Sequence, residues 1–155
     1  MHMPNSLQIL DDLIAFPTVS RDSNLALIDY IERFLAQRGI ASARVLNEDG
    51  RKANLWATIG PADRPGVVLS GHTDVVPVDG QAWSSDPFRM ERRGGNLYGR
   101  GTADMKGFIA CCLAVVEKAV AAPLNTPINL ASSYAEAIGC AGDRRPLDLL
   151  TNAPA

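Results

Sequence analysis

The stretch Val67-Val68-Leu69-Ser70-Gly71-His72-Thr73-Asp74 carries the clearest indication of how this chain folds. It begins with three consecutive apolar residues, which is typical of a strand covered on both faces in a largely parallel sheet. Glycine, histidine and aspartate follow directly. Open α/β sheets bind their ligands outside the carboxyl ends of the strands. The stretch therefore predicts a buried strand over 67–70, with the side chain of His72 projecting into a crevice beyond it.

Apolar periodicity and turn signals predict further elements on both sides of this strand. Before it, a serine cap, helical spacing and a glycine stop predict two helices, and short β-branched or alternating segments predict two strands. After it, a nearly apolar central helix, a buried strand and a final helix are expected. The predicted ranges are helices over Ser6–Phe16, from Asp22 or Ser23 to Gly39, over Thr102–Val120 and from Gly142 or Asp143 to Leu150, and strands over Ala43–Leu46, Asn54–Ile59 and Pro127–Tyr134.

The segment from Gly71 to Gly101 is rich in glycine, proline, aspartate and serine and has little periodicity. A loop of this length inside a compact domain is usually functional. The order of helices, strands and a crossover helix predicts one layered α/β domain. Its sheet is expected to be mixed and largely parallel, with helices on both faces.

The composition of the whole chain excludes several classes of partner. Its 155 residues suit one ordinary domain, and its 15 basic and 17 acidic residues form no long runs. We therefore expect a small-molecule partner, not nucleic acid or an anionic membrane. No stretch approaches the roughly 20 apolar residues that cross a bilayer, and the N-terminus lacks signal-peptide features, so a cytoplasmic location is expected. Cys111, Cys112 and Cys140 are predicted to be buried, reduced thiols.

Three acidic positions accompany His72 as candidates for chemistry. Asp74 could hold one ring nitrogen of His72 and fix its tautomer for a metal; alternatively, the two residues only satisfy each other in a turn. Asp104 lies in a glycine-containing segment where its charge would repel a pyrophosphate, which excludes a dinucleotide fingerprint. It could cap the following helix or bridge two cations. Glu136 lies among small and apolar residues and is a candidate general base, or else a solvated loop residue.

Together these segments resemble the M20 metallopeptidase family, which contains acetylornithine deacetylase, succinyl-diaminopimelate desuccinylase and related carboxypeptidases. Three consecutive motifs look like hallmarks of the acetylornithine deacetylase branch. They are Gly71-His72-Thr73-Asp74-Val75-Val76-Pro77-Val78-Asp79-Gly80, Trp83-Ser84-Ser85-Asp86-Pro87-Phe88 and Leu97-Tyr98-Gly99-Arg100-Gly101-Thr102-Ala103-Asp104-Met105-Lys106-Gly107. The resemblance runs from about Leu7 to the C-terminus and covers the first part of a family member.

The resemblance implies a role for each of the four candidates. His72 would bind one of two divalent cations, usually zinc or cobalt, and Asp74 would orient it. Asp104 would bridge both metals, and Glu136 would serve as general base. The implied reaction is hydrolysis of N-acetyl-L-ornithine, or a similar N-acyl amino acid, to acetate and a free amine by a metal-bound hydroxide.

The chain also departs from the family pattern. Ala137 stands where the resemblance implies a metal-ligand glutamate, and Ala135 replaces the usual aspartate. The family's later carboxylate and histidine ligands and its inserted dimerisation domain are expected to be absent. At most one weakly held cation is therefore expected, because catalytic zinc sites have about three protein ligands. The favoured alternative is a non-catalytic fragment or pseudoenzyme, with possible self-association through an uncovered surface.

Overall fold

The computed structural model describes residues 5–134 of the chain. Its helices are α1 (Ser6–Ile14), α2 (Leu25–Ala36) and α3 (Lys106–Ala121), and its strands are β1 (Ser42–Leu46), β2 (Ala53–Ile59), β3 (Val67–His72), β4 (Glu91–Arg93), β5 (Asn96–Tyr98) and β6 (Ile128–Ser133). The final helix predicted to end at Leu150 lies outside the described residues. No helix within 5–134 is both long and apolar enough to cross a membrane.

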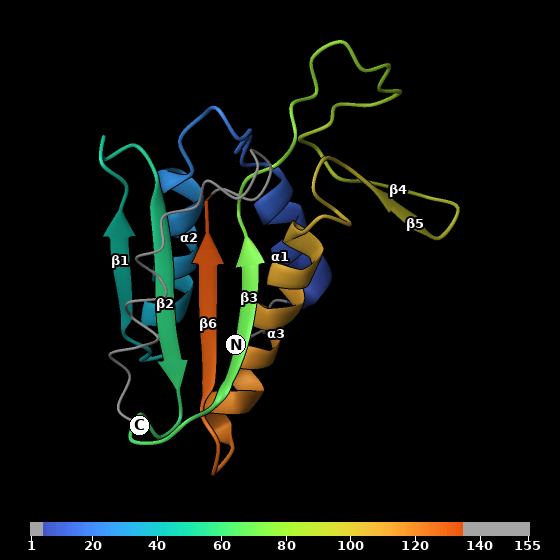
Figure 1. Ribbon diagram of the computed structural model, residues 1–155. Helices are drawn as coiled ribbons and strands as arrows, with labels where there is room; N and C mark the ends of the chain where they lie inside the picture. Colours follow the sequence, from blue (N-terminus) through green and yellow to red (C-terminus); the bar gives the residue numbers. More distant parts are fainter. Residues whose placement is uncertain (1–4, 135–155) are drawn as a thin grey trace.

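The main sheet has the strand order β1-β2-β6-β3 (Figure 1). β1 and β6 both run antiparallel to β2, whereas β3 and β6 are parallel. A short turn joins β1 to β2, which suits an antiparallel pair, and the crossover through α3 joins the parallel strands β3 and β6. The predicted mixed α/β sheet is confirmed, but only one of the three strand pairs that residues 5–134 form in the main sheet is parallel.

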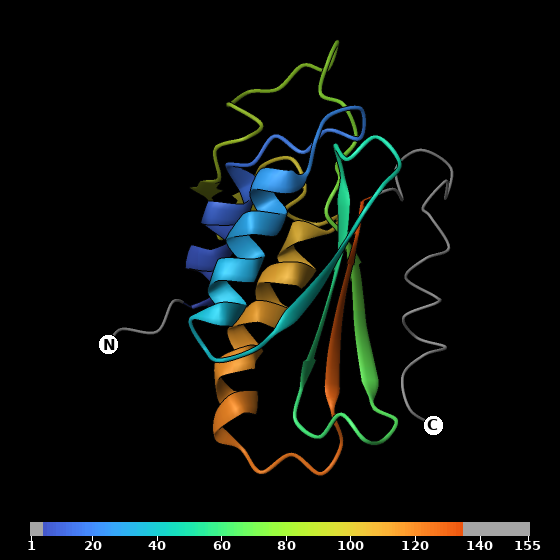
Figure 2. The same cartoon turned by 90° about the vertical axis from the view of Figure 1, so that its left-hand side faces the viewer.

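The three described helices lie on the same face of the main sheet (Figure 2). Along β2 the buried side chains of Leu55, Ala57 and Ile59 alternate with partly exposed neighbours, as expected for a strand with one face on a helical layer. Within residues 5–134, the prediction of helices on both faces is therefore supported for one face of the sheet.

Edge position makes β3 less buried than its apolar run predicted. Val67 and Val68 are 55% and 39% exposed, and Leu69 is half-buried. Because β3 has a described neighbour, β6, on one side only, its first residues are not enclosed. The expectation of a strand covered on both faces was therefore wrong for these residues, and β2 is the buried strand.

Helix α3 is likewise only partly enclosed. Ile109, Leu113 and Val116 face the core, whereas Val115 and Val120 are exposed. The predicted apolar helix is confirmed, but not as a fully central one. On this helix Cys111 is exposed and Cys112 is half-buried, and both are free thiols. The prediction that the cysteines are buried was therefore wrong for Cys111. Cys140 lies outside the described residues.

The ends of the first two helices differ slightly from their predicted positions. The α1 cap is Asn5, whose side chain accepts a hydrogen bond from the Gln8 N–H at 3.0 Å, and not Ser6. Helix α2 follows Asn24, and Gly39 takes a left-handed φ of 73° after its end, as predicted. The five apolar residues predicted for one face of α2 are all buried: Leu27, Ile28, Ile31, Phe34 and Leu35.

The long segment after β3 is not structureless. It contains an antiparallel two-stranded hairpin, β4–β5, which projects away from the main sheet (Figure 1). Gly94 and Gly95, between the two strands, both have positive φ values, which glycine adopts at little cost. The pairing was missed because each strand has only three residues, too few to show a period.

Candidate metal centre

The structure brings three of the four predicted site residues together at one end of the sheet. His72 is the last residue of β3, and its Nε2 lies 2.9 Å from Oδ1 of Asp104. On the other side of the ring, Nδ1 lies 2.9 Å from the backbone oxygen of Asp74 and 3.3 Å from Oδ1 of the same residue. His72 is thus held between two carboxylates that are 30 positions apart in the chain.

The partners of the ring decide which nitrogen can face a cation. Both oxygens beside Nδ1 belong to Asp74 and can only accept, so Nδ1 is placed to donate. A neutral ring then presents an Nε2 lone pair to the Asp104 carboxylate, an arrangement that favours a proton or a metal cation between them. Burial opposes protonation of His72, but its contacts with Asp104 and Asp74 outweigh this and raise its pKa.

A buried polar network supports the Asp74 side of the site. The Ser20 hydroxyl donates to Oδ2 of Asp74 at 2.7 Å, and the Thr18 hydroxyl donates to the backbone oxygen of Thr73 at 2.6 Å. Asn24 donates to the Thr73 hydroxyl at 2.9 Å. All five side chains are buried, so these hydrogen bonds satisfy groups that water cannot reach.

The Asp104 side of the site is open. The side chain of Asp104 is 81% exposed. It does not cap the next helix, because α3 begins at Lys106 with Met105 in the cap position and no side-chain cap hydrogen bond. Gly101, with φ of 91°, turns the chain in front of it, and a Cβ there would lie 2.9 Å from Val75. The cap alternative for Asp104 is therefore excluded.

Lys106 is a residue of this region that the sequence reasoning missed. It is fully buried, and its Nζ donates to the backbone oxygens of Leu13 at 3.0 Å and Phe16 at 2.6 Å. These carbonyls lie at the end of α1, where helices leave such groups without intrahelical partners. Burial lowers the pKa of Lys106 to about 8. The sequence did offer one indication that Lys106 is unusual, because it is a single basic residue at the start of an apolar helix.

The fourth predicted residue, Glu136, lies outside the described residues, as do Ala135 and Ala137. The described chain nevertheless leads toward the site, since Ser133 pairs with His72 and the Thr73 N–H donates to the Ser133 oxygen at 2.8 Å. Tyr134, the last described residue, is thus two residues before Glu136 and next in the chain to a partner of His72.

The donors that the structure offers fit a divalent cation in part. An imidazole nitrogen and a carboxylate oxygen are ligands that zinc and cobalt both accept. Across residues 5–134, however, no group of three or more histidine, cysteine, aspartate or glutamate side chains could hold a metal ion. Within this part of the chain, His72 and Asp104 therefore offer two adjacent candidate donor atoms, fewer than the roughly three protein ligands of a catalytic zinc site.

Solved structures of two peptidases share this fold. A family M20 metallo-carboxypeptidase from Sulfolobus solfataricus superposes with a TM-score of 0.82 at 22% identity, covering 97% of this chain and 35% of its own. Human carnosine dipeptidase 1 gives a TM-score of 0.79 at 23% identity, covering 93% of this chain and 34% of its own. The chain thus shares its α/β fold with these two peptidases, at identities that show the fold alone.

Sequence comparison narrows the class to a family. The model for peptidase family M20/M25/M40 matches residues 68–153, and the chain belongs to this family. Acetylornithine deacetylase of Pasteurella multocida (strain Pm70) is 36% identical over 149 residues, which are 92% of this chain and 39% of that protein. Succinyl-diaminopimelate desuccinylase of Legionella pneumophila (strain Lens) is 41% identical over 117 residues, 75% of this chain and 30% of that protein. The chain spans less than half the length of these relatives.

Proposed function

We propose that this chain binds one divalent cation, zinc or cobalt, weakly through His72 and Asp104, within the lineage of N-acyl amino acid hydrolases. The observation that supports this is the 2.9 Å approach of His72 Nε2 to Asp104 Oδ1 at the carboxyl end of β3. Asp74 orients the ring by accepting from Nδ1, which leaves Nε2 as the nitrogen for the cation.

The proposed substrate class is an N-acyl amino acid such as N-acetyl-L-ornithine. Two relatives carry names for different acylated substrates, which supports the class and not one compound. A bound cation supplies a Lewis acid that polarises the amide carbonyl and lowers the pKa of water. Glu136 is proposed as the general base: it takes a proton from the water whose oxygen forms a bond to the carbonyl carbon. It returns that proton to the nitrogen as the amide C–N bond breaks, so that a carboxylate and a free amine are released.

We favour a chain that binds metal without sustained turnover. Ala137 stands where the resemblance implies a glutamate ligand, and its methyl group has no donor atom. The two candidate ligands within residues 5–134 are fewer than the roughly three that catalytic zinc sites use. The second candidate function is active amide hydrolysis, which the retained Glu136 favours.

Zinc content and N-acetyl-L-ornithine hydrolysis, measured on the 155-residue chain and its variants, test this proposal. The unaltered chain is expected to hold at most one zinc per chain, lost in His72→Ala and Asp104→Asn. Asp63→Asn, which changes an exposed aspartate paired with Arg64, should retain the metal and serves as the matched control. Ala137→Glu is expected to tighten zinc binding about tenfold or more, since it adds a ligand.

The outcomes separate the two candidates. Two zinc ions per chain together with multiple turnovers in the unaltered protein would sink the non-catalytic proposal. Zinc content that is unaffected by both His72→Ala and Asp104→Asn would show that the metal site is elsewhere.

A further inference from the structure

We infer that Ser20 is a positioning residue of the candidate metal centre: its hydroxyl holds the Asp74 carboxylate toward Nδ1 of His72 and so keeps Nε2 available for a cation. This inference rests on the proposed function, because it assigns another residue to the same site. Ser20 is 3% exposed, and its hydroxyl lies 2.7 Å from Asp74 Oδ2 and 3.1 Å from the backbone oxygen of Val75.

The Ser20 hydroxyl has one proton for these two acceptors. The carboxylate oxygen is the closer one, and hydrogen bonds to carboxylates are stronger than those to neutral carbonyls. With Oδ2 of Asp74 held in this way, Oδ1 of the same carboxylate faces Nδ1 of His72 at 3.3 Å. Ser20 thus acts on His72 through Asp74 and does not touch the ring nitrogens.

The position of Asp74 matters because His72 has a second carboxylate on its other side. A neutral imidazole carries one proton and can place it on either nitrogen. Asp74 favours the tautomer protonated on Nδ1, whereas Asp104, 2.9 Å from Nε2, favours the tautomer protonated on Nε2. Only the first leaves a lone pair on Nε2. The backbone oxygen of Asp74 also accepts from Nδ1, so loss of Ser20 should shift this balance without reversing it completely.

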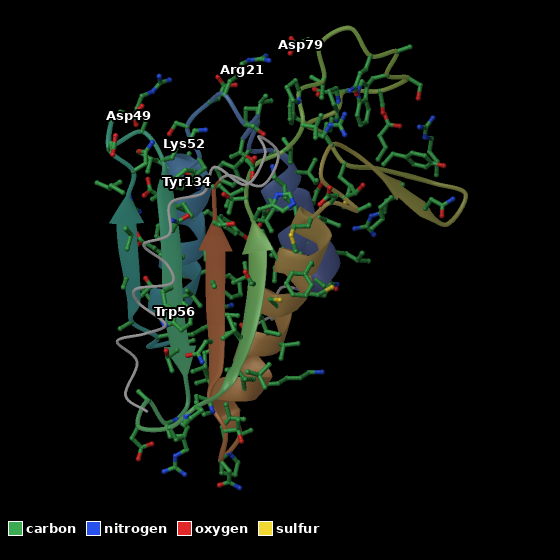
Figure 3. The ribbon with its side chains drawn as sticks, in the orientation of Figure 1. Arg21, Asp49, Lys52, Trp56, Asp79 and Tyr134 are labelled. Atoms are coloured by element: carbon green, nitrogen blue, oxygen red, sulfur yellow. The ribbon has the colours of Figure 1, made fainter. Side chains whose placement is uncertain are left out.

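The backbone of Ser20 is fixed by contacts that do not involve its hydroxyl. Its N–H donates to the Val75 oxygen at 3.0 Å, and the Val75 N–H donates to the Thr18 oxygen at 2.9 Å. Nζ of Lys52 donates to the Ser20 backbone oxygen, and Figure 3 shows Lys52 beside Tyr134 at this end of the sheet. Ser20→Ala therefore removes the hydroxyl contacts and leaves the loop in place.

Thr18 provides a matched control in the same loop. It is as buried as Ser20, and its hydroxyl also crosses to the segment after β3, but it donates to the Thr73 backbone oxygen and not to a carboxylate. Thr18→Val removes one buried hydrogen bond at nearly constant volume. A purely structural role for such loop hydroxyls predicts the same result for both variants.

The test uses ¹⁵N NMR of the His72 ring in a His2→Gln background, which leaves His72 as the single histidine. Spectra recorded at alkaline pH, where the ring shifts no longer change with pH, report the tautomer ratio of the neutral ring. The ratio of the Nδ1-protonated to the Nε2-protonated form is expected to fall at least threefold in Ser20→Ala, to stay unchanged in Thr18→Val and to recover in Ser20→Thr. An unchanged ratio in Ser20→Ala, or an equal fall in both variants, overturns the inference. If Ser20→Ala does not fold, Ser20→Cys, a weaker donor of similar size, is judged by the same criterion.

A Co²⁺ titration separates this inference from the proposed function. Ser20→Ala is expected to weaken Co²⁺ binding about tenfold, as is typical when an outer partner of a metal-binding histidine is removed, and Thr18→Val less than twofold. A parent protein that binds no Co²⁺ refutes the metal proposal, while the tautomer ratio still decides the role of Ser20. Equal Co²⁺ affinity in Ser20→Ala and the parent argues against positioning.

Discussion

Asp74 and Asp104, the two carboxylates on either side of His72, occupy opposite environments. The side chain of Asp74 is 3% exposed and accepts a hydrogen bond from buried Ser20, whereas that of Asp104 is 81% exposed and belongs to the loop before α3. The position of Asp74 is thus determined by the packing of the α1–α2 loop against the end of β3. The Asp104 side chain has no comparable enclosure, so its orientation should respond to charge at His72. Packing of the fold therefore determines the position of Asp74, whereas local electrostatics determines that of Asp104.

The largest effect should come from the buried network behind Asp74. Asn24 is 2% exposed; its side chain accepts from the Ala53 N–H at 2.9 Å and donates to the Ala53 oxygen at 2.8 Å and to the Thr73 hydroxyl at 2.9 Å. Asn24→Ala leaves three buried groups without this partner and should lower the free energy of unfolding by about 3 to 4 kcal/mol, measured by urea denaturation.

Asn47→Ala is the control for this substitution. Asn47 is half-buried, and its Oδ1 accepts from the Lys52 N–H at 2.9 Å in a turn. Its loss should cost about 1 kcal/mol, the ordinary contribution of one hydrogen bond that water can replace. Equal losses in the two asparagine variants would show that the network behind Asp74 is no more rigid than a surface turn.

The next effect concerns the two carboxylates themselves. Asp74→Ala removes the acceptor of the Ser20 hydroxyl and a neighbour of His72 Nδ1 in a buried setting, and should cost about 2 kcal/mol of unfolding free energy. Asp104→Ala should cost less than about 0.5 kcal/mol, because exposed ion pairs contribute little. Thermal unfolding of both variants in metal-free buffer measures the difference. Similar costs would remove the contrast between the two halves of the site.

The difference between local patterns and long-range packing explains which parts of the fold the sequence could predict. Helical periodicity is local, and so the buried face of α2 was correct at all five positions, including Leu27 and Phe34. Burial of a strand depends on what the rest of the chain places over it. An apolar run therefore indicated that residues 67–69 form a strand, but not that Val67 and Val68 lie at an exposed edge.

For the candidate site, motifs pointed to the ring and its two carboxylates but not to their support. His72 and Asp104 were paired through a family resemblance, and the structure places them 2.9 Å apart. Ser20 lies 54 positions from Asp74, and Asn24 lies 49 positions from Thr73. A lone serine or asparagine in a loop is ordinary turn chemistry, so no local pattern distinguishes these residues. Only the three-dimensional pairing of the α1–α2 loop with the end of β3 reveals them.

A smaller effect is expected on the open side, in the loop that precedes Asp104. The Arg100 guanidinium donates to Oε1 of Gln81 and lies 5.2 Å from the centre of the Trp83 ring, and the Trp83 indole donates to the same Gln81 oxygen at 3.0 Å. Arg100→Ala should cost about 1 kcal/mol of unfolding free energy. It should also make Trp83 more accessible to acrylamide, measured by fluorescence in a Trp56→Phe background.

Arg93→Ala is the control for this loop. The Arg93 guanidinium lies 4.4 Å from the centre of the Tyr98 ring and donates to the Ser84 hydroxyl at 3.2 Å, but no contact with the Trp83 ring or with Gln81 is described for it. Its loss should leave Trp83 quenching unchanged. If both arginine variants expose Trp83 equally, the loop is held by the hairpin as a whole and not by Arg100.

The smallest effect should come from a polar contact in the helical layer, away from Asp74 and Asp104. The Tyr30 hydroxyl donates to Oδ2 of Asp12 at 2.9 Å, which joins α2 to α1. Burial first, and then this hydrogen bond, raise the pKa of Tyr30. Because the folded state holds the phenol proton more tightly than the unfolded state, the stabilisation is complete below pH about 10 and is lost at higher pH. Tyr30→Phe keeps the ring and should cost about 0.5 kcal/mol at neutral pH, with the difference from the parent shrinking above pH 10. Urea denaturation across this pH range measures the difference. Tyr98→Phe, which changes an exposed tyrosine of the hairpin, should show no such pH dependence. If the difference in unfolding free energy between Tyr30→Phe and the parent stays constant across this range, the Tyr30 hydroxyl does not donate to Asp12.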